Sequence, residues 1–215
     1  MSDGGGVAKS AAAIATALLW SNGLLPRLGL DVRGRTAANA GFATGYALVF
    51  GSRANWWSVR GLRYGLASAA VVVAGYGAAV AVPGVRSRLR EFADRGPDVT
   101  PAEWIAVHIP IGTVYSEELV FRGTLDPLLD TTFGTRAGIL LGASTFGLWH
   151  IHPARAAGDS VPVTVAATAL GGLVFGLLRR RSDSAAAPAL LHLAVNAGGA
   201  LAPWLAARWA HRSTR

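Results

Sequence analysis

Glu117 and Glu118 are adjacent acids in the stretch S-E-E-L-V-F-R, at the end of a run that is otherwise almost entirely apolar from Trp104 to Phe121. A carboxylate at bilayer depth costs roughly 2.5 to 3.5 kcal/mol, so these acids need compensating partners and indicate a functional site. Arg122 lies four residues after Glu118, so the two share a helix face and can form an ion pair. Glu117 then points about 100° away and is left to face a cavity, as a general base or a metal ligand must.

Two later apolar segments carry further polar pairs at the same four-residue spacing. Phe146 and His150 lie in F-G-L-W-H, where the phenyl ring can form one side of a substrate pocket and the imidazole can project into it. His192 and Asn196 lie in H-L-A-V-N, which places an imidazole and an amide on one helix face as neighbouring donors. Such a pair of donors is an oxyanion hole in outline.

Together these side chains can surround one water molecule and one peptide carbonyl. Glu117, helped by His150, would remove a proton from water, while His192 and Asn196 hold the tetrahedral oxyanion. A second interpretation uses Glu117, His150 and His192 as ligands of a divalent metal such as zinc, with an open coordination position. The residues alone leave both mechanisms open.

The composition predicts a membrane protein. The chain has 215 residues, of which 52% are hydrophobic and only 15% charged, with 27 glycines and no cysteine. Repeated apolar runs rich in small residues predict an all-α, polytopic transmembrane helical bundle of about seven helices, within a range of six to eight. Without cysteine there are no disulfides, thiolate metal sites or cysteine nucleophiles.

The net charge of +8 comes almost entirely from arginine, since Lys9 is the single lysine. The arginines stand between apolar runs, where they set topology and contact anionic lipid, so we expect the lipid bilayer and no nucleic acid as partner. Arginine usage also hints at a GC-rich, bacterial host and hence a multi-pass protein of the bacterial cell membrane.

The expected membrane segments follow one another along the chain. They are residues 7–25, 37–50, 64–82, 104–121, 136–150, 161–178 and 185–209. We divide the chain into N-terminal membrane helices with a polar linker (1–100), a catalytic core (101–205) and a basic tail (206–215).

Several polar features outside the motifs have structural interpretations. Residues 1–6 are expected to be a disordered tail, and Thr100 is expected to cap a helix that starts at Pro101. Asp126, Asp130 and His152 are interpreted as interfacial or loop residues. His108 is interpreted as a satisfied polar group within a helix.

The three motifs, in this order and in separate membrane helices, resemble the CPBP family. This family contains type II CAAX prenyl endopeptidases and bacteriocin-processing or immunity proteins, also called Abi proteins. The motifs E-E-x-x-x-R, F-x-x-x-H and H-x-x-x-N are carried by Glu117, Glu118, Arg122, Phe146, His150, His192 and Asn196.

The resemblance implies a helical intramembrane endopeptidase that acts on a membrane-associated substrate, such as a CAAX-type prenylated or a bacteriocin-like peptide. It also implies catalytic roles for the acids, Arg122, both histidines and Asn196. Members are called metalloproteases, yet a metal-free glutamate mechanism has been argued for the family, so the cofactor stays open. The alternative function is a non-catalytic membrane scaffold or a bacteriocin self-immunity protein. A proton-relay transporter is less favoured, since no inverted repeat is evident.

Overall fold

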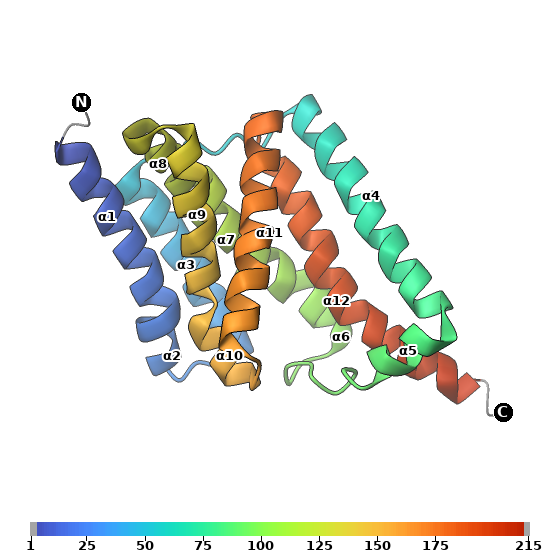
Figure 1. The fold of residues 1–215 in the computed structure, drawn as a ribbon. Coiled ribbons are helices and arrows are strands. Elements are labelled where there is room, and N and C mark those ends of the chain that lie inside the picture. The colour runs from blue at the N-terminus through green and yellow to red at the C-terminus, as the bar shows by residue number, and fades with distance from the viewer. Residues whose placement is uncertain (1–3, 213–215) are drawn as a thin grey trace.

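The computed structural model describes residues 4–212, with side chains described through residue 209, as helices joined by short connections (Figure 1). Within this part of the chain the regular elements are all helical. The prediction of an all-α fold is therefore confirmed.

The N-terminal helices begin earlier than expected. Helix α1 (Gly4–Leu19) continues through the π-helical turn η1 (Trp20–Leu24) into α2 (Leu25–Arg27). The expected disordered tail is thus wrong for residues 4–6, while residues 1–3 lie outside the described part. Helix α3 (Val32–Phe50) starts at Asp31, whose side chain accepts a hydrogen bond from the backbone N–H of Gly34 at 2.7 Å.

Helix α4 (Val59–Ala81) is capped in the same way by Ser58, whose hydroxyl accepts from the Gly61 N–H at 3.1 Å. The short helix expected within the polar stretch 85–100 is α5 (Pro83–Arg90). Figure 1 shows α4 at the edge of the bundle, alongside the last helix, α12 (Ala186–Arg212).

A continuous helical rod over residues 101–133 runs through the middle of the bundle. It starts where expected, because the Thr100 hydroxyl accepts from the Glu103 N–H at 3.1 Å and Pro101 occupies the first turn. Two of its parts are π-helical, and a hydroxyl hydrogen bond from Ser116 to the carbonyl five residues earlier shows that wider turn. The parts of the rod are α6 (Pro101–Glu103), η2 (Trp104–Tyr115), α7 (Ser116–Glu118), η3 (Leu119–Leu125) and α8 (Asp126–Phe133).

The remaining helices pack in front of this rod in the view of Figure 1. They are α9 (Thr135–Trp149), α10 (Ile151–Ala157) and α11 (Val161–Ser182), followed by α12. The sequence predicted only a polar break where α10 lies, so His152 belongs to a short helix rather than to a loop. Helix α9 packs along α11, and α11 in turn contacts α12.

Three helices of the described residues, α4, α11 and α12, are long and apolar enough to cross a membrane. The expected count of seven spans is not confirmed. Helix α9 has 15 residues, which at 1.5 Å per residue is shorter than the roughly 30 Å hydrocarbon core.

The far end of the rod is held to α11 by an ion-pair network. Arg180 donates to both oxygens of Asp130 at 2.9 and 2.8 Å and lies 3.5 Å from Asp126 Oδ2. Asp126 is 4% exposed. The interpretation of these two aspartates as interfacial or loop residues is wrong, because both belong to α8 and serve as acceptors for α11.

Small residues permit the close packing of α9 and α11. A Cβ atom added at Gly147 would lie 2.7 Å from the backbone oxygen of Val165 and 2.9 Å from the Cβ of Ala169. Neither atom can swing aside, since one is backbone and the other is the first side-chain carbon. Gly147 therefore lets the helix that carries Phe146 and His150 approach α11, as small residues do between membrane helices.

We expect Gly147→Ala to destabilise the protein by about 1 to 3 kcal/mol, because the added methyl group forces the two helices apart. The measurement is thermal unfolding of the purified protein in detergent. Gly41→Ala in α3 is the matched control, since a Cβ there meets nothing within 4 Å. Equal melting temperatures for the two variants would contradict the packing argument.

Candidate active site

The two adjacent acids lie in the single α-helical turn α7, between the π-helical parts η2 and η3. Both are buried, Glu117 with 8% and Glu118 with 0% of its surface exposed. Their side chains have different surroundings: Glu118 is enclosed by charged and aromatic groups, whereas Glu117 borders a cavity. The sequence predicted that Glu118 is paired and that Glu117 faces a cavity, and the structure has this arrangement.

Arg122 is the cationic partner of Glu118. Its Nε lies 3.5 Å from Glu118 Oε2, and its Nη2 donates to the Gly172 carbonyl at 3.4 Å. Three aromatic rings surround the guanidinium carbon at 5.5, 4.4 and 5.1 Å from their centroids. They belong to Phe121, Phe146 and Phe175. The rings hold a cation in place without supplying a competing anion.

His192 of α12 connects the two acids. Its Nδ1 lies 2.8 Å from Glu118 Oε1, and its Nε2 lies 3.9 Å from Glu117 Oε2. Because an ionised carboxylate only accepts hydrogen bonds, Nδ1 carries the proton in the shorter contact. The ring also stacks on Phe175, with centroids 4.8 Å apart. The imidazole is therefore fixed, with Nε2 directed toward Glu117.

Glu117 has one satisfied and one free oxygen. Its Oε1 accepts from the indole N–H of Trp149 at 3.3 Å. Its Oε2 has no hydrogen-bond partner in the described part of the chain, although the atom is buried. Buried polar atoms without a partner are uncommon and are found where a water, an ion or a substrate binds. The Glu117 side chain borders a cavity of about 620 Å³.

His150 borders the same cavity from the end of α9. Its Nδ1 lies 2.8 Å from the Phe146 carbonyl oxygen, so Nδ1 is the donor and Nε2 has the lone pair in the neutral ring. The Phe146 ring meets the imidazole edge-on at 4.9 Å. Phe146 thus supports both His150 and the cation Arg122.

Asn196 lies apart from these residues. Its amide N–H donates to the His192 carbonyl of its own helix at 3.2 Å. The side chain lines a second cavity, of about 400 Å³, which does not include Glu117 or His150. Trp104 and residues 95–97 border both cavities and separate them. The structure thus brings six of the seven motif residues together and places Asn196 behind this partition.

The donor set does not fit a metal site in this arrangement. Among the described residues no three histidine or acidic side chains gather closely enough to hold an ion. Glu118 is engaged by Arg122 and His192 and is not available as a ligand. We therefore derive no step through a metal.

The η1 turn contributes contacts that sequence reasoning missed. Ser21 donates to the Trp149 carbonyl at 2.7 Å, and Asn22 donates to the Leu148 carbonyl at 3.0 Å. Asn22 also accepts from the His152 N–H at 2.8 Å. These bonds satisfy the end of α9 next to His150. In the sequence, these contacts were indicated by the polar pair Ser21-Asn22 directly after an apolar run.

The rim of the cavity is formed by a second polar cluster. His108 lies 2.7 Å from the Thr36 hydroxyl and 3.2 Å from Glu103, so its interpretation as a satisfied polar group is confirmed. Arg33 donates to both oxygens of Glu103 at 2.7 and 3.0 Å. The rim thus ties the start of the rod to α3.

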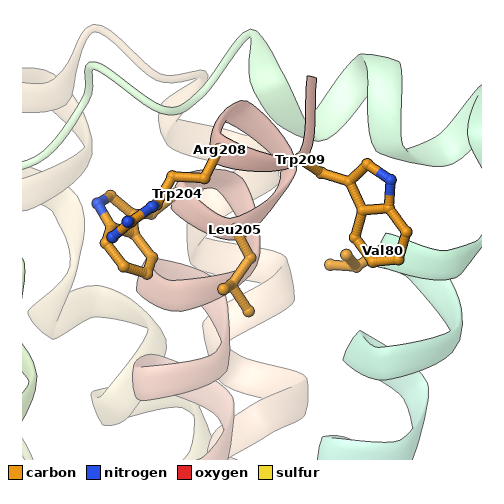
Figure 2. Close-up of a pocket in the computed structure, with 5 residues that line it drawn as sticks. All are labelled: Val80, Trp204, Leu205, Arg208 and Trp209. Atoms are coloured by element: carbon orange, nitrogen blue, oxygen red, sulfur yellow. The ribbon is translucent and has the colours of Figure 1, made fainter. Parts of the chain in front are cut away.

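Another surface pocket, of about 590 Å³, lies between α4 and α12 (Figure 2). Figure 2 shows two tryptophans and an arginine around it. Its lining residues are Val80, Trp204, Leu205, Arg208 and Trp209, so among the described side chains no acid or histidine lines it. The pocket therefore has none of the motif residues, whereas the Glu117 cavity has two of them.

Comparison with known families supports the same region. Residues 100–198 match the model of a family described as Type II CAAX prenyl endopeptidase Rce1-like. The matched span contains all seven motif residues. No curated protein and no solved structure matches the chain.

Removal of Arg122 should cost much of the stability of the protein. We expect Arg122→Met to lower the free energy of unfolding by about 3 to 5 kcal/mol, because Glu118 would keep a buried charge without its cation. The double variant Glu118→Gln/Arg122→Met should regain part of that loss. Thermal unfolding in detergent measures both.

Arg95→Gln is the control for this series, since its ion pair with Asp159 is exposed and should matter little. A melting temperature of Arg122→Met within error of that control would show that Arg122 does not compensate Glu118.

The rim cluster should respond to acid. The hydrogen bond from Arg33, and next that from His108, hold the pKa of Glu103 below its ordinary value of 4.5. A lowered pKa means that the stabilising contribution is complete above pH 4.5 and is lost as the pH falls through the folded value. We expect the melting temperature of the wild type to fall more than that of Glu103→Gln between pH 6 and pH 3. Parallel pH profiles would refute the assignment.

Proposed function

We propose that the protein is a membrane-embedded endopeptidase, because residues 100–198 match the model of the Type II CAAX prenyl endopeptidase Rce1-like family. It hydrolyses a peptide bond of a membrane-associated substrate, with Glu117 as the base that activates water. The lipid bilayer is its environment, and its exposed apolar helix surfaces, such as Val71 and Val73 on α4, face the lipid.

The observation that carries the proposal is that the Glu117 side chain borders a cavity while its Oε2 atom has no hydrogen-bond partner among the described residues. A general base needs a lone pair within reach of the water that it deprotonates. Glu118 Oε2 also lacks a hydrogen bond, but it lies 3.5 Å from Arg122 Nε, and Glu118 does not line the cavity.

In the proposed reaction a water molecule binds between Glu117 Oε2 and the scissile carbonyl. Glu117 takes a proton as the water oxygen forms a bond to the carbonyl carbon, and His150 orients the water through its free Nε2. The resulting tetrahedral species collapses when the carbon–nitrogen bond breaks. The proton held by Glu117 then passes to the departing amine, and the other product keeps the new carboxylic acid.

The oxyanion needs donors that are in place before the reaction. His192 Nε2 supplies one in the doubly protonated ring. The second N–H of the Asn196 amide supplies another if the substrate lies across Trp104 and reaches both cavities. Because the two donors border different cavities, we expect the bound peptide to pass Trp104.

Two substrate classes agree with this site: a CAAX-type prenylated tail and a bacteriocin-like peptide in a bacterial membrane. Both present a flexible peptide next to the bilayer surface. The competing function is a non-catalytic scaffold or self-immunity protein, in which the same polar groups only pack helices.

The test is cleavage of a library of membrane-tethered peptides by the protein in liposomes. We expect Glu117→Gln to lower the rate at least about 100-fold, which is the range of a lost general base. His192→Ala should give a comparable loss, and a strong chelator should leave the wild-type rate unchanged.

Glu91→Gln is the matched control, because this glutamate is exposed in the segment after α5. Full activity of Glu117→Gln would refute the assigned base. Absence of any cleavage by folded wild-type protein would favour the scaffold.

A further inference from the structure

Arg35 is a half-buried arginine on α3 that makes no hydrogen bond or ion pair through its side chain with any residue that the structure describes. The other buried or half-buried arginines among residues 4–209 each have an acceptor. These are Arg86, Arg122, Arg179 and Arg180. A guanidinium that is partly removed from water and lacks an acceptor is costly, and such a group is a candidate for binding an anion.

The Arg35 side chain borders the same cavity as Glu117. Glu117 is the only acid among the described residues that line this cavity, whereas Arg95, His108, His150 and His152 also line it. The nearby acids are already engaged, since Glu103 binds Arg33 and Asp159 binds Arg95. The cavity therefore has an excess of cationic and donor groups at a distance from its catalytic acid.

We propose that Arg35 binds the C-terminal carboxylate of the peptide that is cut at Glu117. The inference rests on the proposed function. A carboxylate is the anion that every unmodified peptide carries at its end, and arginine binds it through two parallel hydrogen bonds. Arg35 thus selects substrates that end shortly after the scissile bond.

The spacing along the helices sets the length of that end. Thr36, the neighbour of Arg35, bonds to His108, which marks the level of Arg35 on the rod. Glu117 is nine positions further along the rod, an axial separation of about 13.5 Å at 1.5 Å per residue. An extended peptide covers about 3.3 Å per residue, so about four residues cover that axial separation.

A lipid phosphate has the same charge and could reach an arginine at the cavity mouth. The two sources differ in a measurable way. Recognition of the peptide end depends on a free carboxylate, whereas recognition of lipid depends on anionic headgroups in the vesicle.

The experiment measures binding and cleavage separately. Binding uses full-length Glu117→Gln protein, which does not consume the probe, in phosphatidylcholine vesicles with or without phosphatidylglycerol. The probes are two fluorescent, membrane-tethered peptides that are identical except for a C-terminal acid or amide. Wild-type protein is assayed for cleavage of the same pair and of tails with one, four and six residues after the cut.

We expect the acid to bind about 10- to 100-fold more tightly than the amide, as for a charge-assisted hydrogen bond. Adding Arg35→Gln should reduce this preference to about one, and Arg35→Lys should restore part of it. In cleavage, Arg35→Gln should raise KM for the acid with little change in kcat, and tails of about four residues should be cut best. Arg53→Gln, an exposed arginine beyond the opposite end of α3, should change neither quantity.

Equal affinities for acid and amide, including no detectable binding of either, overturn the proposal. An effect of Arg35→Gln that appears only with phosphatidylglycerol and is the same for both peptides assigns the site to lipid and also overturns it. Cleavage by the wild type with no acid preference leaves the endopeptidase intact and refutes Arg35 alone. Acid-selective binding without any cleavage refutes the endopeptidase and keeps the carboxylate site.

Discussion

The buried ion pair between Glu118 and Arg122 is the constraint on which the rest of this site depends. Two charges taken out of water cost several kcal/mol each, and their attraction offsets that cost only when further contacts satisfy both groups. Here His192 supplies a hydrogen bond to the acid, and three phenylalanine rings surround the cation. Because these contacts come from the rod, α9, α11 and α12, charge burial fixes four segments relative to one another.

That arrangement explains how the neighbouring acid can stay free. Glu117 has only the Trp149 indole as a close donor, so most of its hydrogen-bonding capacity remains for a ligand. Glu118 engages Arg122 and His192, with one carboxylate oxygen facing each. The pair of acids thus separates two tasks, since one organises the site and the other is available for chemistry.

The sequence predicted much of this organisation for reasons that the structure makes clear. Residues four apart share a helix face, which was enough to pair Glu118 with Arg122 and to place Phe146 beside His150. The same rule was insufficient for Asn196, because a shared face does not decide which cavity a side chain enters, and Trp104 from another helix makes that division. The number of membrane spans was also beyond reach, since an apolar run can be a short buried helix as well as a span.

The π-helical turns were likewise absent from the sequence argument, which assumed 3.6 residues per turn. The Thr124 hydroxyl in η3 donates to the carbonyl five residues back, and the Ser116 hydroxyl at the start of α7 donates to the carbonyl of Ile111 in η2. In these π-helical parts the side chains therefore shift around the axis relative to an ordinary α-helix. The acids escape this shift because α7 is α-helical. Wider turns on both sides change the angle at which the two adjacent acids leave the helix axis. They can therefore place Glu117 and Glu118 in different surroundings more readily than a uniform α-helix.

Residues of the N-terminal helices and of the matched segment 100–198 line the same cavity. The expected boundary near residue 100 separates the motif residues from α1 to α3, yet Ser21, Asn22, Thr36 and Arg35 all come from that first part. The matched segment supplies the groups to which we assign the reaction, while the N-terminal helices line the cavity and contribute Arg35. Chemistry can then be retained in one part of the chain while the choice of substrate changes in the other. The walls of the cavity, rather than the three motifs, are where specificity for a peptide end would be encoded.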